Sequence, residues 1–243
     1  IIGVFMILFG INFSLFYLVL TGNVLQALKS EELRWYLGII AVASVLIAIN
    51  IMPQYTGFWQ ALRYSAFQVS SLITTTGFIT ADYSKWPVFS QTILILLIFV
   101  GACAGSTGGG IKVSRILILI KSSICELRHQ LRPRSVTTIT LEGKLIDSEV
   151  ISSVMSYMAL YCFIFIISQL LLSLDAFSYV TNFTAVTTCI NNVGPGLGSI
   201  GPVDNFSIFT PFSKIVLSFD MLAGRLELLP IAMLFMPSTW KRR

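Results

Sequence analysis

The sequence has few charged residues. Asp, Glu, Lys and Arg make up 11% of its 243 residues, whereas 55% are apolar, and the mean hydropathy is +0.83. A water-soluble domain has about 25% charged residues, so this chain cannot cover a globular surface with polar groups. This scarcity excludes a soluble enzyme and a disordered chain. The sequence therefore predicts an integral membrane protein.

Residue types used in metal and nucleophilic chemistry are also scarce. There is one histidine, His129, and the four cysteines have no CxxC spacing. Three of the cysteines lie in or beside apolar stretches, which is typical of small packing residues. The sequence thus predicts no disulfide, no resident metal site, no covalently bound cofactor and no enzymatic activity.

Long apolar runs, by contrast, are abundant. Five stretches are close to the roughly 20 residues that cross a membrane: 1–20, 35–52, 87–120, 150–172 and 209–236. Two shorter and less apolar stretches, 58–73 and 178–190, are each followed by a polar tract that contains glycine. This pattern is typical of a helix that enters the membrane and turns back. We therefore expect an all-α fold with five spans and two re-entrant helices.

The basic residues predict the orientation. Seven of the 16 Lys and Arg lie within 112–144, and three more close the sequence at 241–243. Short basic loops stay in the cytoplasm, and the five spans place both clusters on one side. We expect a multi-pass protein of the cell (inner) membrane. Basic residues placed beside apolar segments give no reason to expect a nucleic acid partner.

The two halves of the sequence are similar at an offset of 117 residues. Residues 69–77 (VSSLITTTG) align with 186–194 (VTTCINNVG), and a span precedes and follows each of them. Repeats that run in the same direction around an axis along the membrane normal place their turns together in the middle. The sequence therefore predicts a central site made by both turns.

The two turns offer oxygen ligands without a carboxylate. They consist of Thr74, Thr75, Thr76, Gly77 and Phe78 in the first half, and Asn191, Asn192, Val193, Gly194, Pro195 and Gly196 in the second. Glycine permits backbone conformations that point successive carbonyls at one axis. Such carbonyls replace the water shell of a monovalent cation, whereas divalent cations prefer carboxylates. The alternative is that these are ordinary turns between helices.

A glycine run interrupts the third span. Five of the ten residues 101–110 are glycine, and each costs a helix about 1 kcal/mol relative to alanine. We expect a loop inside the membrane that obstructs the pathway and can move, formed by Gly105, Ser106, Thr107, Gly108, Gly109, Gly110 and Lys112. One alternative is close helix packing through small residues. Another is a phosphate-binding loop, although its GxxxxGK[ST] pattern is not met.

The fifth span contains charged residues, which normally face a cavity or a partner. When residues 104–105 are aligned with 223–224, Arg225 lies at the depth of the glycine run. An arginine there would form an electrostatic barrier in a cation pathway. The alternative is an ion pair with Asp220 or Glu227, although neither spacing is ideal within one helix.

Four motifs together resemble the Trk/Ktr/HKT superfamily of potassium transporters, most closely its bacterial TrkH/TrkG branch. They are residues 75–78 (TTGF), 105–112 (GSTGGGIK), 192–196 (NVGPG) and 224–227 (GRLE), in the order of the family. The resemblance implies repeated units of transmembrane helix, re-entrant pore helix, filter loop and transmembrane helix around a pseudo-fourfold pore. It also implies that the first half of the family's sequence is missing here.

The boundaries that the resemblance implies cover the whole chain. Residues 1–20 would be the end of the preceding repeat's last transmembrane helix and 21–34 a cytoplasmic linker. The third pore repeat would be 35–121, with pore helix 58–73, filter 74–78 and broken helix 87–121. A basic cytoplasmic loop, 122–147, would precede the fourth repeat, 148–240, with pore helix 178–190 and filter 191–196.

The function that the resemblance implies is potassium uptake by a channel-like, pore-forming subunit. Potassium would be the transported ion, bound through Thr75, Thr76, Asn192 and Val193, with Gly77 and Gly194 as filter glycines. Residues 105–112 would be the gating loop and Arg225 the cavity arginine. The implied partners are the N-terminal half of the same protein, a second copy in a homodimer, and a cytoplasmic nucleotide-binding regulatory subunit of TrkA/KtrA type. That subunit would contact residues 112–144, for which anionic lipid is the alternative.

Three other functions remain open. A secondary carrier would bind a solute or sodium between broken helices, although the turns lack charged groups for an organic solute. A membrane enzyme would use the glycine run for a phosphate, but no set of nucleophile and base lies at one depth. The third is an assembly subunit with no transport of its own.

Overall fold

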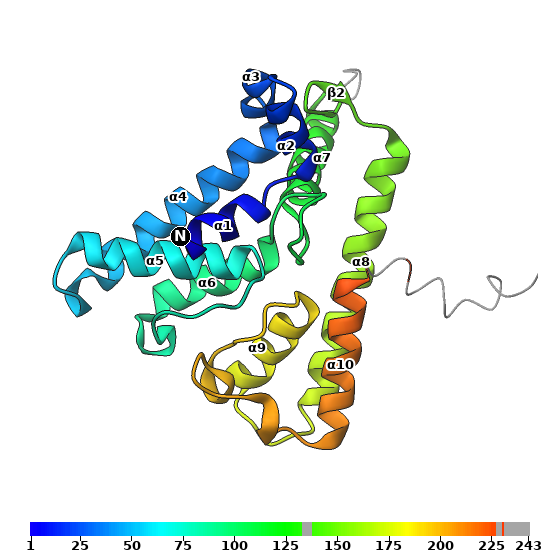
Figure 1. Ribbon diagram of the computed structural model, residues 1–243. Coiled ribbons are helices and arrows are strands. Elements are labelled where there is room, and N and C mark those ends of the chain that lie inside the picture. The colour runs from blue at the N-terminus through cyan, green and yellow to red at the C-terminus, as the bar shows by residue number, and fades with distance from the viewer. Residues whose placement is uncertain (133–137, 227–229, 231–243) are drawn as a thin grey trace, which may run out of the picture.

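The computed structural model describes residues 1–132, 138–226 and 230, and the fold is almost entirely helical (Figure 1). Within these residues two helices, α4 and α8, are long and apolar enough to cross a membrane, and the bent pair α1–α2 is a third candidate. The elements in order are α1 (Ile2–Phe9), α2 (Phe13–Leu20), α3 (Val24–Leu28), α4 (Glu31–Ile51), α5 (Phe58–Ile73), α6 (Val88–Val100), α7 (Val113–Leu131), β1 (Thr140–Leu141), β2 (Lys144–Leu145), α8 (Ser148–Leu172), α9 (Tyr179–Ile190) and α10 (Pro211–Arg225).

Helix α4 shows how these elements form. The Ser30 side chain accepts a hydrogen bond from the Leu33 N–H, which satisfies one of the free donors at the helix start. Its buried residues recur every three or four positions and share one hydrophobic core with residues of α5 and α6: Tyr36, Ile40, Ala43, Ile47 and Ile51. The Ser65 hydroxyl of α5 donates to the Ser44 carbonyl at 2.9 Å. The buried face of α4 thus positions the short helix α5.

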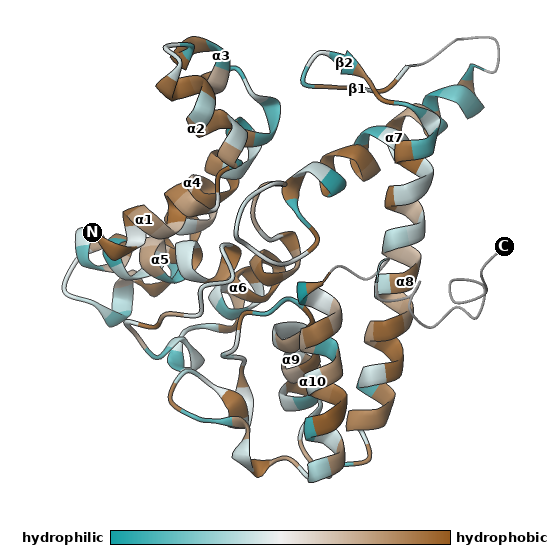
Figure 2. Ribbon diagram, turned by 45° about the vertical axis from the view of Figure 1, so that its right-hand side comes forward, coloured by the Kyte–Doolittle hydropathy of each residue, from teal (hydrophilic) through white to brown (hydrophobic). Residues whose placement is uncertain are grey.

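Two groups of helices have the same arrangement. Helix α5 packs against α4 and α6, and α9 packs against α8 and α10 (Figure 1). Helices α6 and α9 also pack against each other, which joins the two groups. Apolar residues cover much of α4, α6 and α8, whereas polar residues gather toward the end of α7 near the hairpin (Figure 2).

The stretch 1–20 is not the single helix that its hydropathy suggests, because α1 and α2 are bent by 99°. The Asn12 side chain caps the start of α2. A side chain at Gly10 would collide with the Tyr36 hydroxyl, and the Gly10 carbonyl accepts a hydrogen bond from the Cys103 N–H at 3.0 Å. The bend is therefore stabilised by contacts with distant residues, which an apolar run does not reveal.

The region 122–147, expected as a loop, contains regular structure. Helix α7 continues to Leu131, and β1 and β2 form an antiparallel hairpin. Its two turn residues, Glu142 and Gly143, have φ of 53° and 73°, as a two-residue type I′ turn requires. The expected linker 21–34 likewise contains α3 and the start of α4. Within the described residues, this hairpin is the part of the fold that is built from strands.

The third expected span, which the glycine run was predicted to interrupt, is divided into α6 and α7 by residues 101–112. The fifth begins as α10, which ends at Arg225. Most of the remainder of that expected span, and residues 133–137 of the basic region, lie outside the described residues.

Candidate ion-binding site

Helices α5 and α9 end in the same pattern of hydrogen bonds. In each, the second and third residues after the helix donate back to carbonyls of its last turn, which is the Schellman motif. The donors and acceptors in the two helices are 117 residues apart: Thr75 to Leu72 (3.2 Å) and Thr76 to Ser71 (2.9 Å), then Asn192 to Cys189 (3.1 Å) and Val193 to Thr188 (2.9 Å). The two polar tracts therefore leave their helices along the same path.

The backbone of both tracts is left-handed at corresponding residues. Thr75 and Asn192 have φ of 55° and 57°, and Gly77 and Gly194 have φ of 76° and 107°. Glycine adopts these angles readily, but for a β-branched residue such as threonine they are an outlier. A strained backbone persists only where the surrounding structure holds it. The tracts are therefore held in shape by their neighbours.

The tracts present carbonyl oxygens without hydrogen-bond donors. In the described part of the chain, no hydrogen bond ends on a carbonyl of residues 74–78 or 191–195. Both tracts follow helix C-termini, where the helix dipole places partial negative charge. A Cβ at Gly77 would collide with the Val193 carbonyl oxygen and lie 3.3 Å from Pro195. The two tracts thus lie against each other, and both are rich in free oxygen ligands.

Some side chains of the tracts are engaged elsewhere. Asn191 is fully buried, and its amide nitrogen donates to the Tyr161 hydroxyl at 3.0 Å and to the Thr187 carbonyl at 2.8 Å. The Thr74 hydroxyl donates to the Ser70 carbonyl at 2.6 Å. The groups that remain available to an ion at these two positions are therefore the backbone oxygens.

Tyr161→Phe is expected to lower the free energy of unfolding by about 1 kcal/mol, because the Asn191 amide loses a partner in a buried site. Denaturant titration of the detergent-solubilised protein measures this change. Tyr17→Phe removes a hydroxyl from a ring that is 68% exposed and serves as the control. Equal stability of the two variants would show that the Tyr161 contact contributes nothing.

The glycine loop, residues 101–112, contacts both tracts. The Gly109 N–H donates to the Thr75 hydroxyl at 2.8 Å, and a Cβ at Gly109 would lie 2.6 Å from the Asn191 carbonyl oxygen. A Cβ at Gly108 would lie 3.4 Å from the Thr74 carbonyl oxygen. The loop therefore approaches each tract at its first residue, Thr74 or Asn191, and these two residues correspond in the repeat.

The other predicted loop and tract residues have varied surroundings. The Gly105 carbonyl accepts from the first N–H of α2 at 3.1 Å, and the Ser106 hydroxyl donates back to the Cys103 carbonyl at 2.6 Å. Lys112 has φ of 80° and directly precedes α7. Phe78 is 55% exposed. The loop is thus held by the α1–α2 bend on one side and by the tracts on the other.

Glu32 of α4 holds the glycine loop and was not singled out by its sequence. One of its carboxylate oxygens accepts from the Ala104 N–H at 2.7 Å and from the Ser114 N–H at 3.1 Å. Ser114 lies in the first turn of α7, where free N–H groups form a natural anion site. An internal carboxylate fills that site, which argues against a phosphate-binding loop. In the sequence, Glu31 and Glu32 look like ordinary acidic residues at a helix start.

Arg225 ends α10 beside the glycine loop. Its Nη1 donates to the Thr107 carbonyl at 3.2 Å, and both residues line a cavity of about 260 Å³. Asp220, which the sequence offered as an ion-pair partner, is fully buried and accepts from the Ser168 hydroxyl at 2.6 Å. Glu227, the other offered partner, lies outside the described residues. Among the described residues, Arg225 thus contacts the glycine loop and not Asp220.

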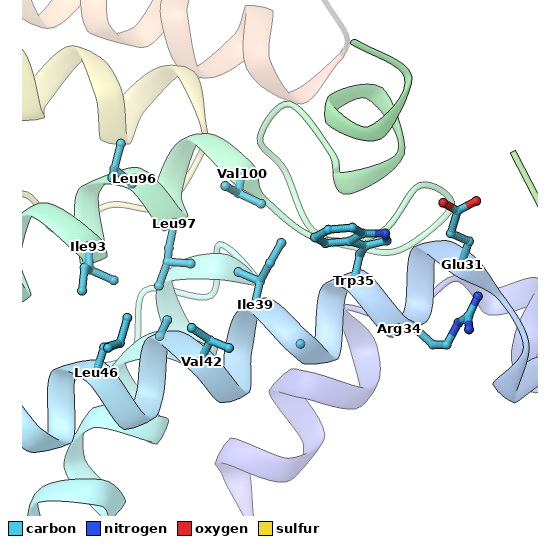
Figure 3. Close-up of a pocket in the computed structure, with 12 residues that line it drawn as sticks. Glu31, Arg34, Trp35, Ile39, Val42, Leu46, Ile93, Leu96, Leu97 and Val100 are labelled. Atoms are coloured by element: carbon cyan, nitrogen blue, oxygen red, sulfur yellow. The ribbon is translucent and has the colours of Figure 1, made fainter. Parts of the chain in front are cut away.

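A cavity of about 750 Å³ lies between α4 and α6 (Figure 3). Side chains such as Ile39, Val42 and Leu96 form apolar walls, and Glu31 and Arg34 lie at one end. None of the predicted site residues lines it. A dehydrated cation needs several oxygen ligands, which the apolar walls of this cavity do not offer.

Known proteins are similar to this chain in sequence and in fold. The TrkH family, described as "Cation transport protein", matches residues 1–242. "Trk system potassium uptake protein TrkH" of Escherichia coli (strain K12) is 33% identical over 99% of this chain and 50% of that protein. "Trk system potassium uptake protein TrkG" of the same strain is 33% identical over 98% of this chain and 49% of that protein. The crystal structure of the potassium transporter TrkH from Vibrio parahaemolyticus has a TM-score of 0.90, with 32% identity over 98% of this chain and 52% of that chain.

The resemblance drawn from the four sequence motifs is thus confirmed. The chain spans about half the length of the curated relatives that it matches. These relatives are potassium uptake proteins and not enzymes, and the helical fold with apolar helices is that of a membrane transporter. The chain belongs to the TrkH family of cation transport proteins.

Proposed function

We propose that the chain contributes two of the four filter segments of a potassium-conducting pore in the cell inner membrane. The observation that carries this proposal is the pair of corresponding tracts whose carbonyl oxygens accept no hydrogen bond in the described chain. In this proposal α5 and α9 are pore helices, and their C-termini direct partial negative charge toward a cation.

Potassium would bind to backbone carbonyls, among them those of Thr75, Thr76, Asn192 and Val193. Carbonyl oxygens replace the water shell of a monovalent cation without holding it too tightly to leave. The absence of a carboxylate from both tracts disfavours divalent cations. Potassium is thus the cargo and not a resident cofactor.

Two segments cannot enclose an ion on all sides. We propose that the N-terminal half of the same protein supplies two more, that the complete transporter forms homodimers, and that a nucleotide-binding subunit of TrkA/KtrA type regulates it. The basic end, with α7 and the hairpin, would face the cytoplasm, because Lys and Arg are retained there. The secondary carrier, which would bind a solute or sodium, is the alternative.

The glycine loop would act as the gate. It approaches both tracts through Gly108 and Gly109, and an ion that leaves the filter on that side would meet the loop first. Glycines allow the loop to change path at little steric cost. Arg225, bonded to the Thr107 carbonyl, would place a positive charge next to this gate and weaken cation binding there.

Rubidium uptake tests the proposed function. The complete transporter would be reconstituted into liposomes with its regulatory subunit, and potassium or sodium added as competitor. We expect potassium, but not sodium, to compete in a saturable manner. If folded protein admits no rubidium, the pore is excluded, and a solute screen for a carrier becomes the next step.

Arg225→Ala is expected to raise rubidium uptake severalfold, because a charge near a partly screened ion contributes on the order of 1 kcal/mol. Initial uptake rates in liposomes measure the change. Lys85→Ala removes a positive charge from a side chain that is 82% exposed and lies outside the glycine loop and the basic region, and should leave the rate unchanged. If Arg225→Ala only reduces the yield of folded protein, then Arg225 has a structural role.

A further inference from the structure

The β-hairpin contacts the same residue that holds the glycine loop. A carboxylate oxygen of Glu142, in the hairpin turn, accepts from the Ser30 hydroxyl at 2.8 Å and from the Glu32 N–H at 3.1 Å. The Glu32 carboxylate in turn accepts from Ala104 within the loop and from Ser114 in the first turn of α7, which follows the loop. The backbone of Glu32 is therefore bonded to the hairpin, and its side chain is bonded to the glycine loop and to the start of α7.

The hairpin turn itself does not need a glutamate. Glu142 and Gly143 occupy the two left-handed positions of a type I′ turn, where Asn-Gly is the preferred pair. A long side chain with positive φ is strained, and strain of this kind gathers at functional positions. The carboxylate of Glu142 is used in the contact with α4.

A second contact joins the hairpin to α7. Lys121 forms an ion pair with Glu31 at 2.6 Å and donates to the Thr140 carbonyl at 2.8 Å. Glu31 begins α4, Thr140 begins the hairpin, and α7 follows the glycine loop directly. The hairpin, the start of α4 and the helix after the loop are thus held together.

Exposure differs sharply along this chain of contacts. Glu32 and Ser30 are 7% and 6% exposed, whereas Glu142 lies on the surface. A cleft of about 430 Å³ beside the hairpin is lined in part by Lys29, Glu142 and Lys144. A molecule at the basic end can therefore reach the hairpin but not Glu32.

We propose that the β-hairpin controls the glycine loop through Glu142 and Glu32, with Glu32 as a positioning residue. Displacement of the hairpin withdraws Glu142 from the start of α4. Glu32 then holds Ala104 and Ser114 less firmly, and the loop leaves the tracts more often. The effect on transport rests on the proposed function of the loop as the gate, whereas the contacts themselves do not.

Glu142→Asn isolates this contact. Asn-Gly favours the same turn, so the hairpin remains, while the carboxylate that accepts from the Ser30 hydroxyl and the Glu32 N–H is removed. In the complete transporter, hydrogen–deuterium exchange of peptides that contain Ala104 and Ser114 should become about tenfold faster, as expected for the loss of one charge-assisted hydrogen bond. Glu32→Gln should also make hydrogen–deuterium exchange of the same peptides faster. Glu126→Gln, which removes an exposed carboxylate of α7, should not.

The double variant decides whether the two glutamates act in series. If they do, these peptides exchange no faster in the double variant, Glu142→Asn with Glu32→Gln, than in Glu32→Gln alone. Unchanged exchange in Glu142→Asn, or effects that multiply in the double variant, would overturn the coupling. Rubidium uptake is measured on the same proteins. Faster exchange without faster uptake would support the coupling and contradict the proposal that the loop is the gate.

Discussion

Replacement of Gly77 by alanine is expected to reduce potassium-selective uptake at least tenfold. Gly77 has φ of 76°, and an L side chain in the left-handed region costs roughly 1–2 kcal/mol. The added Cβ would also collide with the carbonyl oxygen of Val193. Because this contact joins the two tracts, relief of the collision must shift at least one of them away from its ligand geometry.

Rubidium uptake with potassium or sodium as competitor measures the loss. Gly194→Ala separates the two causes, because φ at Gly194 is 107° but no atom lies within 4 Å of the added Cβ. It should weaken selectivity through backbone strain alone. Gly38→Ala, in α4, meets neither obstacle and should behave like the wild type. Full selectivity in Gly77→Ala would remove this residue from the filter.

Local features of the fold follow from the sequence. The apolar runs predict where α4 and α8 lie, and the polar tracts after 58–73 and 178–190 mark where two short helices end. The glycine run predicts a break, because several glycines within ten residues cannot remain a helix. These features depend on residues that are close in the chain, which is why pattern alone reveals them.

Contacts between distant residues could not be predicted in this way. Glu32 bonds to residues 72 and 82 positions later, and Glu142 bonds back to Ser30 across 112 positions. The side-chain amide of Asn191 is buried and donates to the Tyr161 hydroxyl, which its sequence does not reveal. The sequence around a carboxylate at a helix start, or around an amide in a turn, does not indicate which distant residue is its hydrogen-bond partner. Only the packing of the helices decides between these partners.

Deletion of residues 108–110 is expected to raise basal rubidium uptake about tenfold and to preserve selectivity for potassium. The deletion removes the Gly109 hydrogen bond to Thr75 and the approach to the Asn191 carbonyl. The loss of about one hydrogen bond, from Gly109 to Thr75, corresponds to a change in uptake of roughly this size. Residues 74–78 and 191–195 are left intact, so the selectivity of the filter should not change. Initial uptake rates, with and without competing sodium, measure both quantities.

Gly109→Ala tests the same contact without shortening the chain, because its Cβ would lie 2.6 Å from the Asn191 carbonyl oxygen and must move away. Gly105→Ala is the control for backbone strain within the loop, since Gly105 has φ of 67° and its Cβ faces the Asn12 side chain on the other side of the loop. Faster uptake in Gly109→Ala but not in Gly105→Ala would show that contact with the tracts is what limits flux. If both variants fold with normal stability and normal uptake, the glycines serve only the close approach of helices, and the gate must lie elsewhere in the pathway.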